Sequence, residues 1–239
     1  MSSESKVLKV AICLYPGVQL LDFAGPLDLL SVLSPAHAGI VKPPPPVLFS
    51  MTQLATEDTV VASAGLVMKA TSTYDKEIAS GVQYDVLLVP GGLGSSPGKT
   101  PEVLLEFLKA QAPRAQYLLS VCSGSWILQQ AGLLTGKRAT TNKSLFNVIT
   151  AASKDEVQWV RKARWVEDGT VWTASGVTAG MDMTIAFITQ LAGAGVAAVV
   201  SNGAEYSACA QEDDPFADVW NDEAQMKLAL SFGEHMNHL

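Results

Sequence analysis

The sequence predicts an α/β fold in which a mostly parallel sheet is covered by helices on both faces. Short apolar runs alternate with helical segments of about ten residues, as in "YDVLLVP" at 84–90 and "EVLLEFLKAQA" at 102–112. The runs are continuously apolar, which is typical of strands buried on both faces. Hydrophobic residues make up 48% of the 239-residue chain and charged residues 16%, so a large core can form. Together these features indicate βαβ units.

The first elements follow from apolar runs and turn residues. The run 7–14 is expected to form a strand that ends at a Tyr-Pro-Gly turn. A helix is predicted in "LLDFAGPLDLLSVL", with Asp22 just before it and Pro26 in its first turn or just before it. Pro43–Pro46 predicts a stiff surface loop, with a proline-rich ligand motif as the alternative. Strands follow at 47–54 and, as a pair around Ala64-Gly65, at 60–70.

The second half continues the alternation. Strands are predicted at 84–90, 116–121 and 138–141, and a hairpin at 157–176 that turns at 167–169. Helices are predicted at 102–112, at 125–134 with a stop at Gly136, and at 181–191, 196–206 and 222–236. We expect a single domain over 1–239, with a core at about 7–193 and a helical C-terminal extension at 194–239.

Composition excludes several function classes. The net charge of −7 disfavours nucleic acid as a partner. No apolar run approaches the roughly 20 residues that span a membrane, and "MSSESKVLK" does not resemble a signal peptide, so a cytoplasmic protein is expected. Three cysteines without metal-ligand spacing and three scattered histidines predict no metal site, and we expect no cofactor.

The strongest chemical signal is Cys122 in "SVCSGSW", between an apolar strand and an apolar helix. The pattern parallels the G-x-S-x-G nucleophile elbow, with cysteine in place of serine and Ser120 in place of the first glycine. A thiol at a helix N-terminus is expected to have a lowered pKa. The alternative is a buried cysteine without chemistry, which is how we interpret Cys13 and Cys209.

Two further features lie at neighbouring strand ends. Gly91-Gly92 closes the strand before the elbow, where backbone N–H groups could stabilise an anion; a tight turn is the alternative. Asp22 follows the first strand, and its alternative role is that of a helix N-cap.

The motifs "YPGVQLLDFAGPLDLL", "VPGG", "SVCSGSWILQQAGLLTGKRATT" and "SGVTAGMD" together resemble the ThiJ/PfpI superfamily over about residues 7–193, and most closely its isonitrile hydratase branch. The resemblance implies a flavodoxin-like three-layer sandwich of the class I glutamine amidotransferase type, acting as a homodimer. It also implies that Cys122 is the nucleophile and Asp22 the neighbouring acid.

The resemblance assigns further residues to the site. Ser123 stands where the branch often has threonine, so it is a third catalytic candidate. The amides of Gly91 and Gly92 fit an oxyanion or substrate-nitrogen pocket, and Gly176 and Thr178 belong to a turn near the site.

One departure from the family pattern concerns position 142. Many relatives have a histidine there, and this chain has Asn142, which we expect to shape the substrate pocket. A Cys–His pair is therefore disfavoured, and with it the protease, amidotransferase and glyoxalase-type functions. His37 could approach the site, but its spacing does not support a base.

The expected reaction is hydration of an isocyanide to an N-substituted formamide. Cys122 would form a thioimidate, with Asp22 as acid and base and one proton shared by the two groups. The alternatives are a glyoxalase III-like conversion of 2-oxoaldehydes, a redox-sensing thiol and an inert binding scaffold. Trp126 and Phe146 could line the pocket or belong to the core, the usual place for aromatic residues in apolar segments.

Overall fold

A computed structural model describes residues 5–153, 156–220 and 227. Its centre is a seven-stranded sheet in the order β10-β11-β7-β6-β1-β2-β5, in which all neighbours are parallel except the pair β10–β11. The strands of this sheet are β1 (Lys6–Cys13), β2 (Val47–Ala55), β5 (Ser72–Thr73), β6 (Val86–Val89), β7 (Tyr117–Val121), β10 (Trp165–Asp168) and β11 (Val171–Ala174). This is the mostly parallel α/β fold that the sequence predicts.

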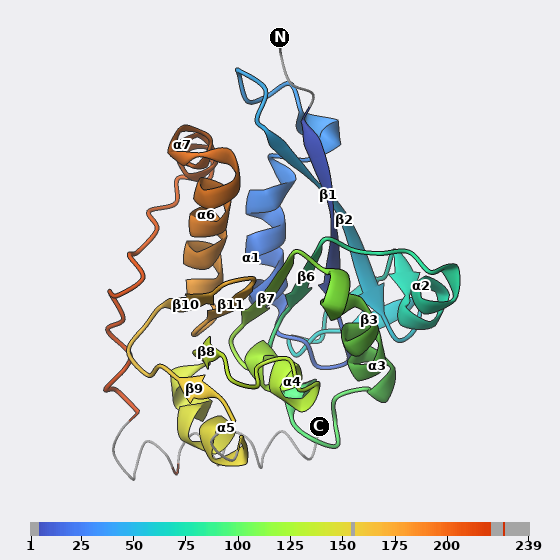
Figure 1. Cartoon of the computed structure of the whole chain (residues 1–239), viewed down its shortest axis with the longest axis vertical. Helices are drawn as coiled ribbons and strands as arrows, with labels where there is room; N and C mark the ends of the chain where they lie inside the picture. The colour runs from blue at the N-terminus through green and yellow to red at the C-terminus, as the bar shows by residue number, and fades with distance from the viewer. Residues whose placement is uncertain (1–4, 154–155, 221–226, 228–239) are drawn as a thin grey trace.

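Helices cover both faces of the sheet (Figure 1). One layer consists of α1 (Leu20–Ser31), α6 (Ala179–Ala192) and α7 (Ala194–Gly203), and the other of α2 (Tyr74–Ser80), α3 (Glu102–Gln111) and α4 (Gly124–Gln130). The central strands β6 and β7 are almost completely buried between the layers. Three layers therefore enclose the core, as the sequence predicts.

Smaller elements frame the ends of the sheet. The hairpin of β3 (Thr59–Val61) and β4 (Val67–Lys69) turns at Gly65, and β8 (Arg138–Ala139) pairs with β9 (Gln158–Trp159) in a parallel ribbon. The helix α5 (Phe146–Ala152) lies beside this ribbon (Figure 1). Short 3₁₀ helices cover Pro35–His37, Leu93–Ser95, Ala112–Arg114 and Lys143–Leu145.

The strand order places the chemical motifs together. The chain runs from β1 outward to β2 on one side and continues through β6 and β7 on the other, so the order reverses between β1 and β6. Ligands of open α/β sheets bind at such a switch point, beyond the carboxyl ends of the strands. The segments that follow β1, β6, β7 and β11 contain Asp22, Gly91, Cys122 and Gly176.

The first helix begins earlier than predicted. It starts at Leu20, so Asp22 lies inside its first turn and Pro26 lies within the helix. The reason is the preceding tight turn, in which the Val18 N–H donates to the Tyr15 carbonyl and the Gln19 N–H to the Gly91 carbonyl. Gln19 therefore occupies the N-cap position, and the interpretation of Asp22 as a cap is wrong.

Other boundaries also shift. The helix predicted at 125–134 ends at Gln130, because Gly132 adopts a left-handed φ of 75° and redirects the chain before Gly136. The strand predicted at 138–141 is reduced to two residues, and only 165–174 of the segment 157–176 forms the hairpin. The sequence patterns missed α2 and α5.

The C-terminal extension begins with a helix, as predicted. After α7, residues 204–220 run without further helix, and the helix predicted at 222–236 lies outside the described residues apart from Lys227. Pro43–Pro46 forms a loop, as predicted. In the ranges that the structure describes, none of the helices combines the length and the hydrophobicity needed to cross a bilayer.

Substitution of Gly124 tests how tightly the turn at Cys122 packs against β6. A Cβ atom there would lie 2.1 Å from the Val89 carbonyl oxygen, so we expect Gly124→Ala to lower the free energy of unfolding by about 3 kcal/mol or to prevent folding. Gly195→Ala is the matched control, since nothing lies within 4 Å of a Cβ there. Urea unfolding should show an unchanged or raised midpoint for this control. Equal stability of Gly124→Ala and the wild type would contradict the packing described.

Candidate active site

Cys122 occupies a strained turn between β7 and α4. Its φ is 59°. Among the non-glycine residues that the structure describes, only Glu205 also has a positive φ. Such backbone costs on the order of 1–3 kcal/mol and is maintained only by its surroundings. Here the Cys122 N–H donates to the Ala174 carbonyl at 3.1 Å, and the absence of a side chain at Gly124 lets the turn approach Val89. The geometry is that of the predicted nucleophile elbow.

Asp22 is fully buried at the start of α1. Its Oδ2 accepts a hydrogen bond of 2.9 Å from the Gly91 N–H, whereas Oδ1 has no hydrogen-bond partner among the described residues. Burial raises the pKa of Asp22 to about 7, and the Gly91 N–H and the Cys122 thiol oppose this rise. The carboxyl group can therefore gain or lose a proton near neutral pH.

Cys122 and Asp22 influence each other's protonation. Burial raises the pKa of the Cys122 thiol, and the charge of Asp22 raises it further; the Ser123 N–H and the Asn142 amide act in the opposite direction. The predicted net lowering of this pKa is wrong: the Ser123 N–H at the helix start does act in that direction, but burial outweighs it, because Cys122 is only 8% exposed and the thiolate would lose its solvation. The resting proton of the pair therefore lies on sulfur.

Asn142 contacts the sulfur directly. Its Nδ2 lies 3.2 Å from the Cys122 Sγ. The orientation of the amide is fixed, because its Oδ1 accepts hydrogen bonds from the N–H and the hydroxyl of Ser144, at 2.9 and 2.6 Å. An amide is no base, so Asn142 supplies a hydrogen-bond donor to sulfur where a histidine could exchange protons.

Ser123 links the elbow to the glycine turn. Its hydroxyl accepts the Gly92 N–H at 3.1 Å and lies 2.8 Å from the Ser95 Oγ. The amides of Gly91 and Gly92 are thus already bound, to Asp22 and Ser123. Their role as donors to substrate stays a prediction. The sequence patterns missed Ser95, since a serine in a glycine-rich loop gives no signal of its contacts.

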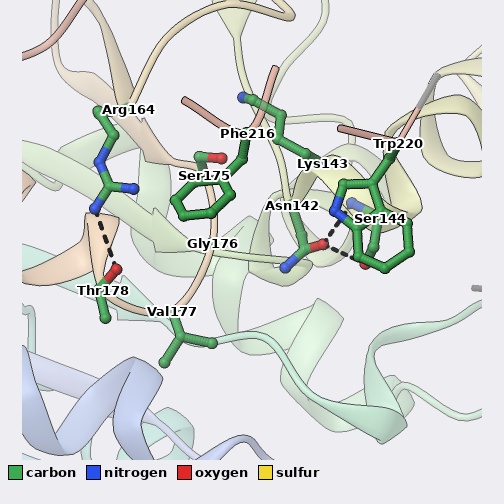
Figure 2. A pocket seen from close by; sticks show the side chains of 10 residues that line it. All are labelled: Asn142, Lys143, Ser144, Arg164, Ser175, Gly176, Val177, Thr178, Phe216 and Trp220. Carbon is green, nitrogen blue, oxygen red and sulfur yellow. Dashed lines mark hydrogen bonds between the residues drawn. The ribbon is translucent and has the colours of Figure 1, made fainter. Parts of the chain in front are cut away.

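A cavity of about 240 Å³ opens beside Asn142 (Figure 2). It is lined by Asn142, Lys143, Ser144, Arg164, Ser175, Gly176, Val177, Thr178, Phe216 and Trp220. Three predicted substrate-binding residues, Asn142, Gly176 and Thr178, therefore share one wall. Cys122, Asp22 and Ser123 do not line this cavity, and the contact between Asn142 and sulfur connects the two parts of the site.

The segment 204–220 contributes Phe216 and Trp220 to the cavity lining, and it is attached to the rest of the chain at two buried ion pairs. Arg164 binds Asp182 through Nε at 2.9 Å, and Asp182 also accepts from the Tyr206 hydroxyl and the Cys209 N–H. Lys143 pairs with Asp214 at 3.2 Å. No motif in the sequence predicted these pairs, because their members lie far apart in the chain.

The remaining candidates lie elsewhere. His37 is beyond the C-terminal end of α1, whereas Asp22 is in its first turn, so His37 does not approach the site. Phe146 is buried against Trp159 and does not line the cavity, in agreement with a core role. Trp126 is half-buried outside the cavity.

The other cysteines differ from each other. Cys13 is buried, as expected for a core residue, but Cys209 is exposed because it lies on the non-helical segment after α7. Within the described ranges, no cluster of histidine, cysteine and acidic residues could hold a metal ion.

The chain is similar to known proteins in both sequence and structure. A model of the DJ-1/PfpI family matches residues 8–190. The chain is 35% identical over 200 residues to an isonitrile hydratase from Pseudomonas putida, which covers 84% of this chain and 79% of that protein. It is 28% identical over 123 residues to a deglycase from Pyrococcus horikoshii, covering 52% and 70%. A ThiJ/PfpI family structure from Pseudomonas syringae aligns with a TM-score of 0.72 and 26% identity, covering 98% and 90%.

Burial of Asp22 should reduce stability above neutral pH. Its folded-state pKa of about 7 exceeds the ordinary value of 3.8, so the native state binds the extra proton between these values; stability falls as the pH rises from about 4 to about 7, and the full loss is present above 7. We expect Asp22→Asn to raise the free energy of unfolding at pH 8, by at most about 4 kcal/mol, and to have little effect at pH 4.

Urea unfolding of Asp22→Asn at both pH values measures this effect, with Asp28→Asn on the exposed face of the same helix as the control. A destabilised Asp22→Asn at pH 8 would show that the carboxylate is stabilised by its surroundings, contrary to the account.

Proposed function

The chain belongs to the DJ-1/PfpI family, and from that premise we propose that it is a cysteine-dependent hydratase that adds water to an isocyanide and releases an N-substituted formamide. The observation that carries the proposal is the pairing of an elbow thiol with a buried carboxyl group whose pKa is about 7. The similarity to an isonitrile hydratase supports it.

The first stage forms a thioimidate. The Asp22 carboxylate takes the thiol proton as the Cys122 sulfur attacks the terminal isocyanide carbon, and Asp22 then delivers this proton to the same carbon. The carbon gains one bond to sulfur and one to hydrogen, and the nitrogen keeps a double bond to it. Asp22 is thereby returned as a carboxylate.

The second stage consumes water. Asp22 removes a proton from water as the oxygen attacks the thioimidate carbon, and this proton passes to the substrate nitrogen. Collapse of the tetrahedral intermediate breaks the carbon–sulfur bond, and the hydroxyl proton returns to sulfur. The products are the N-substituted formamide and the thiol, so protons balance over the cycle.

The burial of the sulfur favours a slender substrate. Cys122 is only 8% exposed and does not line the cavity, whereas its neighbour Asn142 does. The isocyano group is linear and two atoms long, so it can reach the sulfur while its substituent stays in the cavity. A low-pKa, exposed sensor thiol is disfavoured by the same burial.

Glyoxalase III-like chemistry is the second candidate function, and the similarity to a deglycase favours it. A 2-oxoaldehyde could form a hemithioacetal with Cys122, but the subsequent proton transfers need a base, and at position 142 the chain offers an amide. A homodimer, a cytoplasmic location and the absence of a cofactor stay predictions.

A two-substrate assay separates the candidates. Phenyl isocyanide and methylglyoxal are offered to the wild type, to Cys122→Ala and to the control Cys13→Ala, with products identified by mass spectrometry. We expect formanilide from the wild type and from Cys13→Ala, and none above background from Cys122→Ala. Lactate formation without formanilide would select the glyoxalase reaction, and neither product would exclude both.

The pH profile tests the role of Asp22. Below about pH 7 both Asp22 and Cys122 hold protons, so no base is available and kcat/KM should rise as the pH increases through this value. Asp22→Asn should lose a factor of about 10²–10⁴ in kcat, whereas Asp28→Asn should keep both rate and profile. A profile that is flat from pH 5 to pH 8 would exclude Asp22 as the titrating group.

A further inference from the structure

Arg164 presents an unused hydrogen-bond donor to the cavity. Its side chain is only 6% exposed. Nε and Nη2 bind Asp182, and Nη2 also binds the Thr178 hydroxyl, but Nη1 has no hydrogen-bond partner among the described residues. Figure 2 shows Arg164 at the cavity edge, with one terminal nitrogen on Thr178 and the other turned toward the Phe216 ring. The side chain is nine-tenths buried and already paired with Asp182, and a terminal nitrogen without an acceptor in such surroundings favours an acceptor from a ligand.

Both buried ion pairs beside the cavity present their cationic member to it. Arg164 and Lys143 line it, whereas their partners Asp182 and Asp214 do not. Lys143 donates hydrogen bonds to the Thr140 hydroxyl and the Ala163 carbonyl, and it forms an ion pair at 3.2 Å with the Asp214 Oδ2, which has no hydrogen-bond partner among the described residues. A ligand in the cavity therefore meets the cationic side of both pairs. Lys143 is engaged by three protein groups, whereas the Arg164 Nη1 is engaged by none among the described residues.

The lining is mainly apolar, although Ser144 and Ser175 belong to it, and the space is small. Phe216 and Trp220 come from the segment after α7, and Val177 from the turn before α6. Drug-sized ligands occupy roughly 300–1,000 Å³, so a cavity of about 240 Å³ suits one small ring or chain. Asn142 lines the cavity and lies 3.2 Å from the sulfur, so the reacting end of a bound molecule is expected at Asn142, while the rest of the molecule extends along the lining that includes Arg164.

We propose that this cavity binds the N-substituent of the substrate, and that the substituent is a small apolar group ending in a carboxylate that Arg164 binds. This inference rests on the proposed function and specifies its substrate class. The isocyano carbon would then point past Asn142 to Cys122, while the carboxylate receives the Nη1 hydrogen bond. A charge-assisted hydrogen bond to a buried guanidinium is stronger than a neutral one, so the negative charge itself should contribute to recognition.

The kinetic test compares 4-isocyanobenzoate with 4-isocyanobenzamide, which has a similar shape and no charge. We expect the wild type to prefer the carboxylate by at least about tenfold in kcat/KM. In Arg164→Lys, which keeps a charge for Asp182 but loses the second terminal nitrogen, the ratio should fall toward one. Arg161→Lys is the matched control, since Arg161 packs on Phe146 outside the cavity, and it should retain the ratio.

A binding test separates this inference from the proposed function. Calorimetry with Cys122→Ala measures 4-formamidobenzoate against 4-formamidobenzamide without any turnover. The inference is supported if Cys122→Ala binds the carboxylate more tightly than the amide and if this preference disappears when Arg164→Lys is added to Cys122→Ala. This result would hold even if no isocyanide is hydrated. Equal turnover of both isocyanides by the wild type overturns the inference and leaves the hydratase proposal intact, and so does equal binding of both formamides. The wild-type comparison needs no variant, so it decides the matter if Arg164→Lys does not fold.

Discussion

The burial of one carboxyl group beside one thiol is the constraint on which the site depends. Asp22 has one oxygen on the Gly91 N–H and the other without a partner, and no solvent reaches it. In such surroundings two negative charges cannot coexist, so Asp22 and Cys122 titrate as a pair that holds one proton near neutral pH. The proton that the proposed reaction must move is therefore present before substrate binds.

The surrounding structure maintains this pair at a cost in stability. The elbow keeps Cys122 at a positive φ, Gly124 permits the close approach of α4 to β6, and Ser123 joins the elbow to the turn after β6. Asn142 adds a donor to sulfur without adding a second base. With an amide at position 142, Asp22 is the base in both stages of the proposed cycle.

The sequence predicted features that depend on neighbouring residues and missed those that depend on distant ones. The strands, the sheet class and the elbow at Cys122 follow from local patterns, and the resemblance added Asp22. The pKa of the thiol was predicted wrongly, because a helix end is visible in sequence whereas burial by other segments is not. Arg164 and Phe216 escaped notice for the same reason: they meet only when the segment after α7 folds back over the turn before α6.

Infrared difference spectroscopy tests the central claim most directly, because it observes the shared proton itself. The S–H stretch that disappears in Cys122→Ala reports the thiol, and the acid carbonyl stretch that disappears in Asp22→Asn reports the carboxyl group. The account predicts that the S–H band persists at pH 8 while the acid carbonyl band is lost as the pH rises through about 7. A missing S–H band at pH 8, or a carbonyl band already lost near the ordinary aspartate pKa, would contradict it.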